Sequence, residues 1–235
     1  RSLYQSRSKE HAFTGSQTAL AWYKLPWGDR IELILNGSYA SSKPNESFSL
    51  NRNEYFKTGE KDLRNYYNDS RSNRYNIRGT FTYGIEIPYT KWTVLVGPDF
   101  EQTYQSVKGL KYRLDELGGD WIANPELTFA TLPSNMEQLS GVIDEDVSRS
   151  YQTLKKNTGG ELIFQRSGPS SYLVLSLSIS EEKERLNYHT SALDTIARRS
   201  RVVFRPSFIY DCNDDKKTIR LYYYMQSQTP DFFSI

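Results

Sequence analysis

Few side chains in this sequence stand in a spacing that carries out chemistry. The run Asp211 to Asp215, DCNDD, begins like a calcium loop, but Lys216 stands where that loop needs Gly and Tyr222 where it needs Glu. We interpret the run as a turn. His11 and His189, the two histidines, have no metal-ligand partner four residues on and no Ser and Asp in a catalytic arrangement.

The glycine pairs and the single cysteine also give no pattern typical of a catalytic or metal-binding site. The pairs at 118–119 and 159–160 are glycines without a phosphate-binding pattern, which indicates a loop or a strand bend. Cys212 is the one cysteine, so a disulfide framework or a cysteine-zinc site is excluded. We therefore predict no enzyme, no cofactor and no metal site; a hydrolase of the outer membrane that uses His189 is the less favoured alternative.

The chemistry that remains is electrostatic. Charged side chains recur at alternate positions, opposite aromatic ones, and we take them as candidate ligand-binding or lumen-lining residues: Arg78, Glu86, Asp99, Glu101, Arg199, Arg201, Arg205 and Arg220. Thirty Lys and Arg stand against 28 Asp and Glu, a net charge of +2, with no basic block. A nucleic-acid partner is therefore not expected.

The stretch 72–107 shows which elements would position these charges. Odd positions from Tyr75 to Ile87 are mostly apolar, whereas even positions from Asn76 to Glu86 are mostly polar. A period of two is that of a strand with one apolar face. After a turn at 88–91, the pattern continues with apolar residues at 92, 94, 96 and 100. Both arms exceed the usual strand of about 5–6 residues, which indicates a hairpin of a membrane barrel.

Three further hairpins follow the same plan. Short turns are expected at 26–29, 88–91, 167–170 and 213–216, and long connections at 41–71, 108–147 and 181–197, with a loop at 1–16. An extension of the strand around 48–56 is an alternative within the first long connection. Long and short connections alternate, so all long ones lie at one end, as in outer-membrane barrels. The spacing of Ser134 and Glu137 predicts a short helix. Pro98 and Pro206 lie within expected strands, where they need a bulge or a rim position.

Composition agrees with this interpretation. Hydrophobic residues make up 37% of the chain and aromatic ones 14%, which suits strands with one apolar face and aromatic girdles. No apolar run approaches the roughly 20 residues of a membrane helix. We predict an all-β fold: an antiparallel up-and-down meander of about eight long strands. Residues 1–235 would form a single segment of a larger transmembrane β-barrel, without its plug and its remaining strands.

The faces can be assigned residue by residue. We expect an outer, lipid-facing set of Phe81, Tyr83, Val94, Leu175, Phe204 and Leu221, with Arg78, Glu86, Glu101, Arg201 and Arg220 on the inner face. A soluble antiparallel sheet that packs its apolar face inward would give the same periodicity. The two hypotheses differ in what covers the apolar face, which is lipid in a membrane barrel and the protein core in a soluble sheet.

The chain resembles the β-barrel region of the TonB-dependent-receptor-like outer-membrane proteins of Gram-negative bacteria. The motifs that carry the resemblance are NIRG at 76–79, the stretch 151–165, FRPSF at 204–208, LYYY at 221–224 and SQTP at 227–230. It covers roughly residues 17 to 230, and its motifs are diffuse. It implies a slice of a barrel of about 22 strands with a plugged lumen.

By this resemblance, the protein would take up an unknown small ligand across the outer membrane. Its partners would be outer-membrane lipid and lipopolysaccharide, a plug domain and a periplasmic energy-coupling protein. The plug and the coupling segment are not in this sequence. Two alternatives stay open: a small self-contained barrel that serves as an anchor or adhesin, and a soluble lipocalin-like binding barrel.

Overall fold

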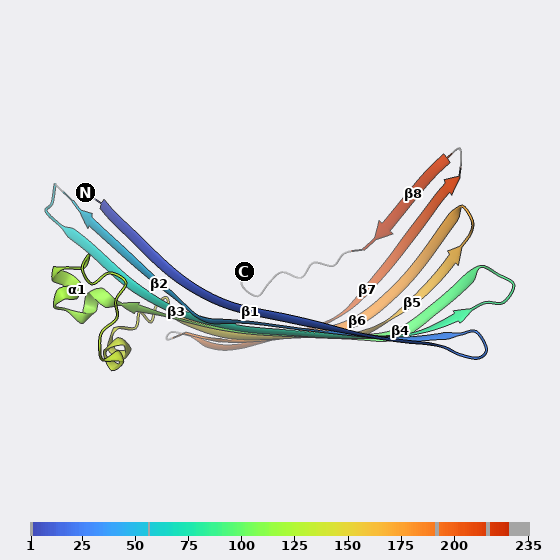
Figure 1. The fold of residues 1–235 in the computed structure, drawn as a ribbon, viewed down its shortest axis with the longest axis horizontal. Helices are drawn as coiled ribbons and strands as arrows, with labels where there is room; N and C mark the ends of the chain where they lie inside the picture. Colours follow the sequence, from blue (N-terminus) through green and yellow to red (C-terminus); the bar gives the residue numbers. More distant parts are fainter. Residues whose placement is uncertain (1, 56, 191–192, 215–216, 226–235) are drawn as a thin grey trace.

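The computed structural model describes residues 2–55, 57–190, 193–214 and 217–225. It contains a single antiparallel sheet of eight strands in the order β1 to β8, so each strand is paired with its neighbour in sequence (Figure 1). The predicted all-β antiparallel meander is confirmed. The strands are β1 (Ser2–Lys24), β2 (Arg30–Glu54), β3 (Lys61–Glu86), β4 (Trp92–Arg113), β5 (Arg149–Ser167), β6 (Ser171–His189), β7 (Asp194–Asp214) and β8 (Lys217–Tyr224).

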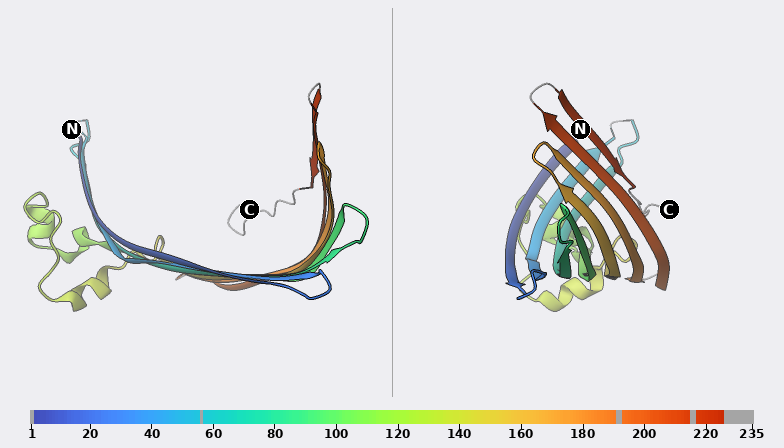
Figure 2. Two further views of the ribbon diagram at one scale, coloured as in Figure 1. Left: turned by 45° about the vertical axis from the view of Figure 1, so that its right-hand side comes forward. Right: turned by 90° about the vertical axis from the view of Figure 1, so that its right-hand side faces the viewer.

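The sheet is bent into a trough whose two ends rise on the same side (Figures 1 and 2). The turns at 25–29, 87–91 and 168–170 lie at one end, which we call the turn end. The opposite end carries a long insert, residues 114–148, with η1 (Leu114–Leu117), α1 (Asp120–Ala123) and η2 (Met136–Val142). In the described part of the chain, no helix is long and apolar enough to cross a lipid bilayer.

The strands extend far beyond their predicted ends. Residues 1–16 were expected to form a loop, but β1 begins at Ser2. The expected long connections 41–71 and 181–197 shrink to 55–60 and 190–193, because β2, β3, β6 and β7 continue through them. The alternation is interrupted there because polar side chains predominate, and because the register of β2 shifts by one residue at 43–45. Backbone N–H and C=O groups still pair across neighbouring strands whatever the side chains.

The third expected long connection, 108–147, is partly correct. β4 runs on to Arg113, and the insert follows it. The short helix predicted near Ser134 is present as η2, but its cap is Asn135, whose Oδ1 accepts a hydrogen bond from the Glu137 N–H at 3.0 Å. The turn expected at 213–216 is wrong in part, because β7 continues to Asp214.

A β-bulge at 43–45 keeps the apolar residues of β2 on one face. Against both β1 and β3, the register shifts by one residue at this point. Before the bulge Leu35 pairs with Gly79, and after it Phe48 pairs with Tyr67, so an odd and an even position of β2 share one face. The extra residue compensates for the change of phase in the sequence.

The two strand prolines need neither a bulge nor a rim position, contrary to expectation. Pro98 pairs with Gly160 of β5, whereas the β3–β4 ladder is interrupted beside it, between the pairs of Asp99 and Val96. There β3 approaches closely: a Cβ on Gly97 would lie 1.7 Å from the Phe81 carbonyl oxygen. Pro206 lies where β8 ends, and its carbonyl accepts from the Met225 N–H at 3.3 Å.

The insert covers one face of the sheet at its own end. Its Leu114, Leu139 and Val142 pack on Phe48 and Tyr67, and all five are buried. The Phe48 and Tyr67 rings lie 5.0 Å apart, and Tyr67 stacks on Tyr112 at 5.5 Å. This apolar cluster, together with a bond from the Asp144 N–H to the Lys111 carbonyl at 2.8 Å, fixes the insert on β4.

Candidate functional site

The register divides the side chains of the sheet into two faces. Residues directly opposite each other in neighbouring strands share a face, and Arg78, Glu101, Asn157, Glu182 and Arg201 form one such row from β3 to β7. All eight candidate charges lie on this face, which we call the polar face. Phe81, Tyr83, Val94, Leu175, Phe204 and Leu221 lie on the other, the apolar face, in agreement with the division expected from the alternation.

The apolar face carries a band of exposed large side chains. Phe81 is 39% exposed, Phe204 52% and Leu221 53%. The band is bounded toward the insert by a row of aromatic residues on β2, β3 and β4: Tyr39, Tyr75 and Tyr104. The rings of Tyr75 and Tyr104 stack at 5.2 Å. On β5 and β6 the boundary is charged, with Lys156, Glu181 and Lys183.

Aromatic residues also lie at the turn end of the band. Tyr83 donates through its hydroxyl to Asp29 Oδ2 at 2.5 Å, and Trp27 Nε1 donates to the same oxygen at 2.9 Å. These contacts fix the β1–β2 turn on β3. The stretch from Tyr75 to Ile85 is about 33 Å along the strand at 3.3 Å per residue. A tilt of about 40° reduces this to roughly 25 Å, the height of the lipid-facing band of membrane barrels.

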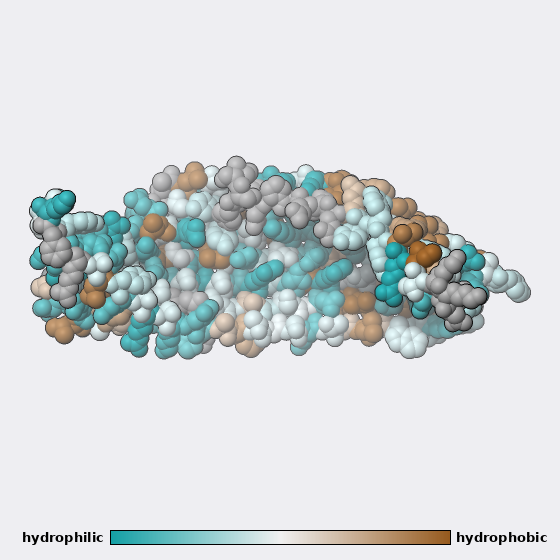
Figure 3. Space-filling view, turned by 90° about the horizontal axis from the view of Figure 1, so that it is seen from above, coloured by the Kyte–Doolittle hydropathy of each residue, from teal (hydrophilic) through white to brown (hydrophobic). Residues whose placement is uncertain are grey.

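The polar face lines the inside of the trough. Seen from above, the hollow side of the sheet is mostly hydrophilic over the middle of the strands (Figure 3). A hollow of about 250 Å³, which we call the central hollow, is lined on this face by residues of β4 to β7: Glu101, Thr103, Lys155, Asn157, Glu182, Glu184, Arg199 and Arg201. A second hollow of about 350 Å³ adjoins it at Asn157 and includes Arg78, Asp99, Glu161 and Arg205.

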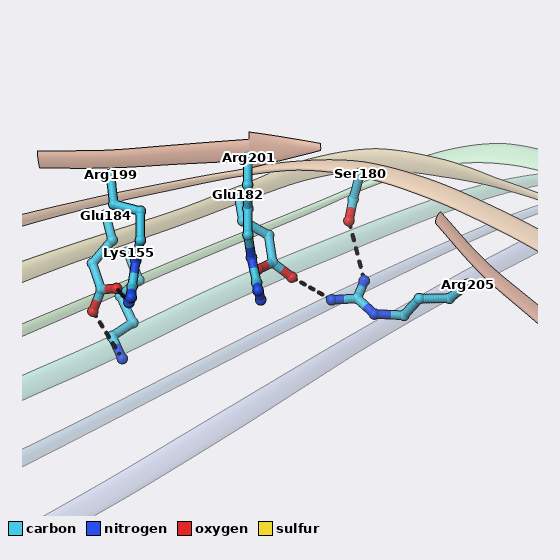
Figure 4. Close-up of polar contacts among 7 residues, drawn as sticks. All are labelled: Lys155, Ser180, Glu182, Glu184, Arg199, Arg201 and Arg205. Atoms are coloured by element: carbon cyan, nitrogen blue, oxygen red, sulfur yellow. Dashed lines mark hydrogen bonds and ion pairs between the residues drawn. The ribbon is translucent and has the colours of Figure 1, made fainter. Parts of the chain in front are cut away.

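Glu182 on β6 is the centre of an ion-pair network (Figure 4). Arg201 donates to its Oε2 through Nε at 2.8 Å and through Nη2 at 2.5 Å. Arg205 contacts Oε1 through Nη2 and donates through Nη1 to Ser180 Oγ at 3.1 Å. Each carboxylate oxygen therefore has its own guanidinium, which fixes three side chains in one arrangement.

Glu184 repeats the arrangement two residues along β6. It contacts the Arg199 guanidinium on β7, and its Oε1 forms an ion pair with Lys155 Nζ on β5 at 3.0 Å. Its side chain is only 9% exposed. A carboxylate this buried needs positive charge beside it, and two cations supply that charge. We call the six residues Lys155, Glu182, Glu184, Arg199, Arg201 and Arg205 the charge network.

The network also sets the ionisation of Glu182, which lies beyond the apolar band. Burial raises the pKa of this carboxyl, but hydrogen bonds from Arg201 and Arg205, and their positive charges, outweigh burial and bring the pKa below its ordinary value. Glu182 is therefore ionised at neutral pH, and the network holds more positive than negative charge.

Only three of the eight candidate charges, Arg199, Arg201 and Arg205, belong to the network. Arg78 lies directly opposite Glu101, whose Oε1 accepts from Asn76 Nδ2 at 2.6 Å. Asp99 lines the second hollow. Two candidates lie elsewhere: Glu86 is at the turn end of β3, opposite Thr93, and Arg220 pairs with Asp211 at 3.3 Å near the β7–β8 turn.

Sequence reasoning missed Lys155, Glu182 and Glu184. The two glutamates were assigned to a charged loop tip at 181–196. A signal was present, because they continue the alternate polar positions Ser176, Ser178 and Ser180 in phase along β6.

In the described part of the chain, the histidines and the acidic run at 211–214 are not assembled into a reactive site. Among the described residues, no group of three or more His, Cys, Asp and Glu side chains could hold a metal ion. His189 Nδ1 lies 3.9 Å from Asp194 Oδ1 at the end of the β6–β7 hairpin, and both side chains are largely exposed. The charge network is suited to binding by charge and hydrogen bonding.

Comparison of the chain with protein-family models, with curated proteins and with solved structures found no match. Function must therefore be inferred from the sheet and its two faces.

Proposed function

We propose that this chain forms part of the wall of an outer-membrane β-barrel, and that its polar face lines a chamber that binds a small polar solute and lets it pass. Outer-membrane lipid and lipopolysaccharide would surround the apolar face. Active uptake, with a plug domain in the lumen and a periplasmic energy-coupling protein, is the part of the proposal that comes from the family resemblance.

The observation that carries the proposal is the pair of opposite faces. Side chains such as Phe204 and Ile179 are more than half exposed on the apolar face. In water, each Å² of apolar surface is unfavourable by about 25 cal/mol relative to an apolar environment. Acyl chains provide that environment, and the flanking aromatic rows suit the two lipid–water interfaces. Charges on the polar face need the water of a lumen.

Strand length supports an extension on one side of the membrane. β1 to β7 are 19 to 26 residues long, whereas about 9–11 residues suffice to cross a bilayer. The apolar band lies toward the turn end, so the excess length projects at the insert end, where side chains outside the apolar cluster under the insert are mostly polar. Short turns in the periplasm and long hairpins outside the cell follow the plan of bacterial barrels.

Two alternatives are less well supported. A lipocalin-like carrier needs an apolar interior, whereas the inside of this trough carries the charge network. A self-contained eight-stranded anchor needs β1 and β8 to pair, and in the described part of the chain they lie at opposite edges of the sheet.

Cell fractionation tests the proposal. The complete gene product, produced in a Gram-negative host, should be recovered with the outer membrane and should need detergent for extraction. Unheated samples should migrate differently from boiled ones on SDS gels, because a folded membrane barrel resists the detergent. Recovery as a soluble, monomeric protein from cells lysed without detergent would overturn the proposal.

A further inference from the structure

The proposed function does not define the solute. The charge of the central hollow limits which chemical class of solute can bind there. Resting on that function, we propose that the central hollow binds the anionic groups of a small polyanionic solute, through carboxylate, phosphate or sulfate oxygens.

The first argument is the charge of the lining. Four cationic side chains on the polar face, Lys155, Arg199, Arg201 and Arg205, surround the three carboxylates of this hollow, which are Glu101, Glu182 and Glu184. On β4 and β5 the lining also includes the neutral polar side chains of Thr103 and Asn157. An anion entering the hollow therefore meets a net positive potential.

The second argument is how the carboxylates are shared. Glu182 serves both Arg201 and Arg205, and Glu184 serves both Arg199 and Lys155. Two carboxylates are thus shared among four cations, which leaves the charge network with a net positive charge. The contacts described for Arg201 use Nε and Nη2, and the hydrogens of Nη1 can still bind a ligand oxygen. A guanidinium held in a rigid orientation binds oxyanions in two-point contacts at low entropic cost.

The third argument is spacing. Arg199 and Arg201 lie on one face of β7, two residues and therefore about 6.7 Å apart along the strand. Lys155 lies two strands from Arg199, about 9.6 Å across the sheet. Lys155 and Arg199 nevertheless meet at one carboxylate, that of Glu184, so they form a single cationic position. The spacing along β7 separates this position from Arg201, which suits a molecule with two anionic groups.

The test is binding to the complete protein in detergent micelles, measured by titration calorimetry at low salt. Citrate and pyrophosphate are the anionic probes, which separate carboxylate from phosphate chemistry; galactose and spermidine are the neutral and cationic ones. We expect citrate or pyrophosphate to bind and the other two not to. Binding should weaken strongly in 0.5 M NaCl, because salt screens the charges.

Two arginines of β7 form a matched pair for this test. Arg199 faces the central hollow, and Arg198, its neighbour in sequence, lies on the opposite face. Arg199→Gln should weaken anion binding roughly tenfold or more, the effect of losing a charge-assisted hydrogen bond. Arg198→Gln should leave it unchanged. Glu182→Gln should tighten binding, since it removes a negative charge and releases two guanidinium groups.

The opposite signs of these effects separate binding from misfolding, which would weaken binding in both variants. Spermidine binding in preference to both anions, or equal loss in Arg198→Gln and Arg199→Gln, would overturn the inference. A protein that fractionates with the outer membrane yet binds neither anion would refute the inference alone. A protein that binds citrate but is soluble would refute the proposed function and leave the anion site in place.

Discussion

Arg201 lies directly opposite Glu182 on the neighbouring strand and donates to its carboxylate through Nε at 2.8 Å. The pair lies inside the trough, at the height where the apolar band on the other side of the sheet gives way to Glu181 and Lys183. The pair therefore lies near one border of the apolar band; in the proposed membrane orientation this border is the outer rim, where a solute would enter.

The charge network should make stability depend on pH in acid. Because its pKa is lowered in the folded protein, Glu182 contributes stability that is present above its ordinary pKa of 4.5 and is lost as pH falls through the folded value. Urea unfolding from lipid vesicles at pH 7 and pH 3 measures this. Glu182→Gln should be less stable than the parent at pH 7 and equal to it at pH 3. A difference that persists in acid would contradict this assignment.

An added charge should destabilise the protein more on the apolar face of β3 than on its polar face. Phe81→Arg places a guanidinium in the middle of the apolar band, at an expected cost of roughly 2–4 kcal/mol. Thr80→Arg, one residue away, faces the second hollow and should cost much less, because the cation stays hydrated. Reversible unfolding of the two variants from vesicles gives the difference. Equal costs would mean that both faces meet the same solvent.

The buried tyrosine beneath the insert should resist ionisation. Burial, with the nearby negative charge of Asp69, raises the pKa of Tyr67 from 10 to about 12. The contribution of the Tyr67 hydroxyl to the stability of the folded protein is therefore fully present below about pH 10. It is lost as the pH rises through about 12. In an ultraviolet titration, the late step of Tyr67→Phe should contain one tyrosinate fewer than that of the parent. Late steps of equal size in the two proteins would mean that Tyr67 ionises earlier and is solvated.

The insert should detach from the sheet without unfolding it. Leu114 is fully buried in the apolar cluster, and Leu114→Ala removes packing worth about 2–5 kcal/mol. We expect faster hydrogen exchange and protease cleavage within 114–148, with the strands still protected. Leu127→Ala is the control, because that side chain is 81% exposed. Loss of protection in β5 to β7 would show that the insert is part of the main folding unit.

The strands could be predicted from the sequence where their two faces meet different environments. Around Arg78 and Phe81, one face is charged and the other apolar, so alternation assigned the strand and its faces correctly. At 41–71, polar side chains predominate and the bulge shifts the few apolar positions, such as Phe48, out of phase, so no continuous period is seen. There, pairing with the neighbouring strands extends the β structure.

Two further features depend on contacts between distant residues. The bulge at 43–45 is recognisable once Leu35 and Phe48 are known to share a face, which the pairing with β3 establishes. Glu182 and Glu184 had no apparent partners in the sequence, since Lys155 and Arg199 come from two other strands. Local pattern identified the strand, and the register identified the site.

The central claim is that lipid covers the apolar face and water the polar one. Ile179 and Ser178 are neighbours on β6 that lie on opposite faces, Ile179 57% exposed and Ser178 lining the second hollow. In a Cys212→Ser background, Ile179→Cys and Ser178→Cys can each carry a nitroxide spin label in the complete protein in lipid vesicles. We predict that the label at 179 is relaxed by oxygen, which dissolves in the bilayer, and the label at 178 by a water-soluble nickel chelate. Similar access of the chelate to both labels, or the reverse pattern, would contradict the account.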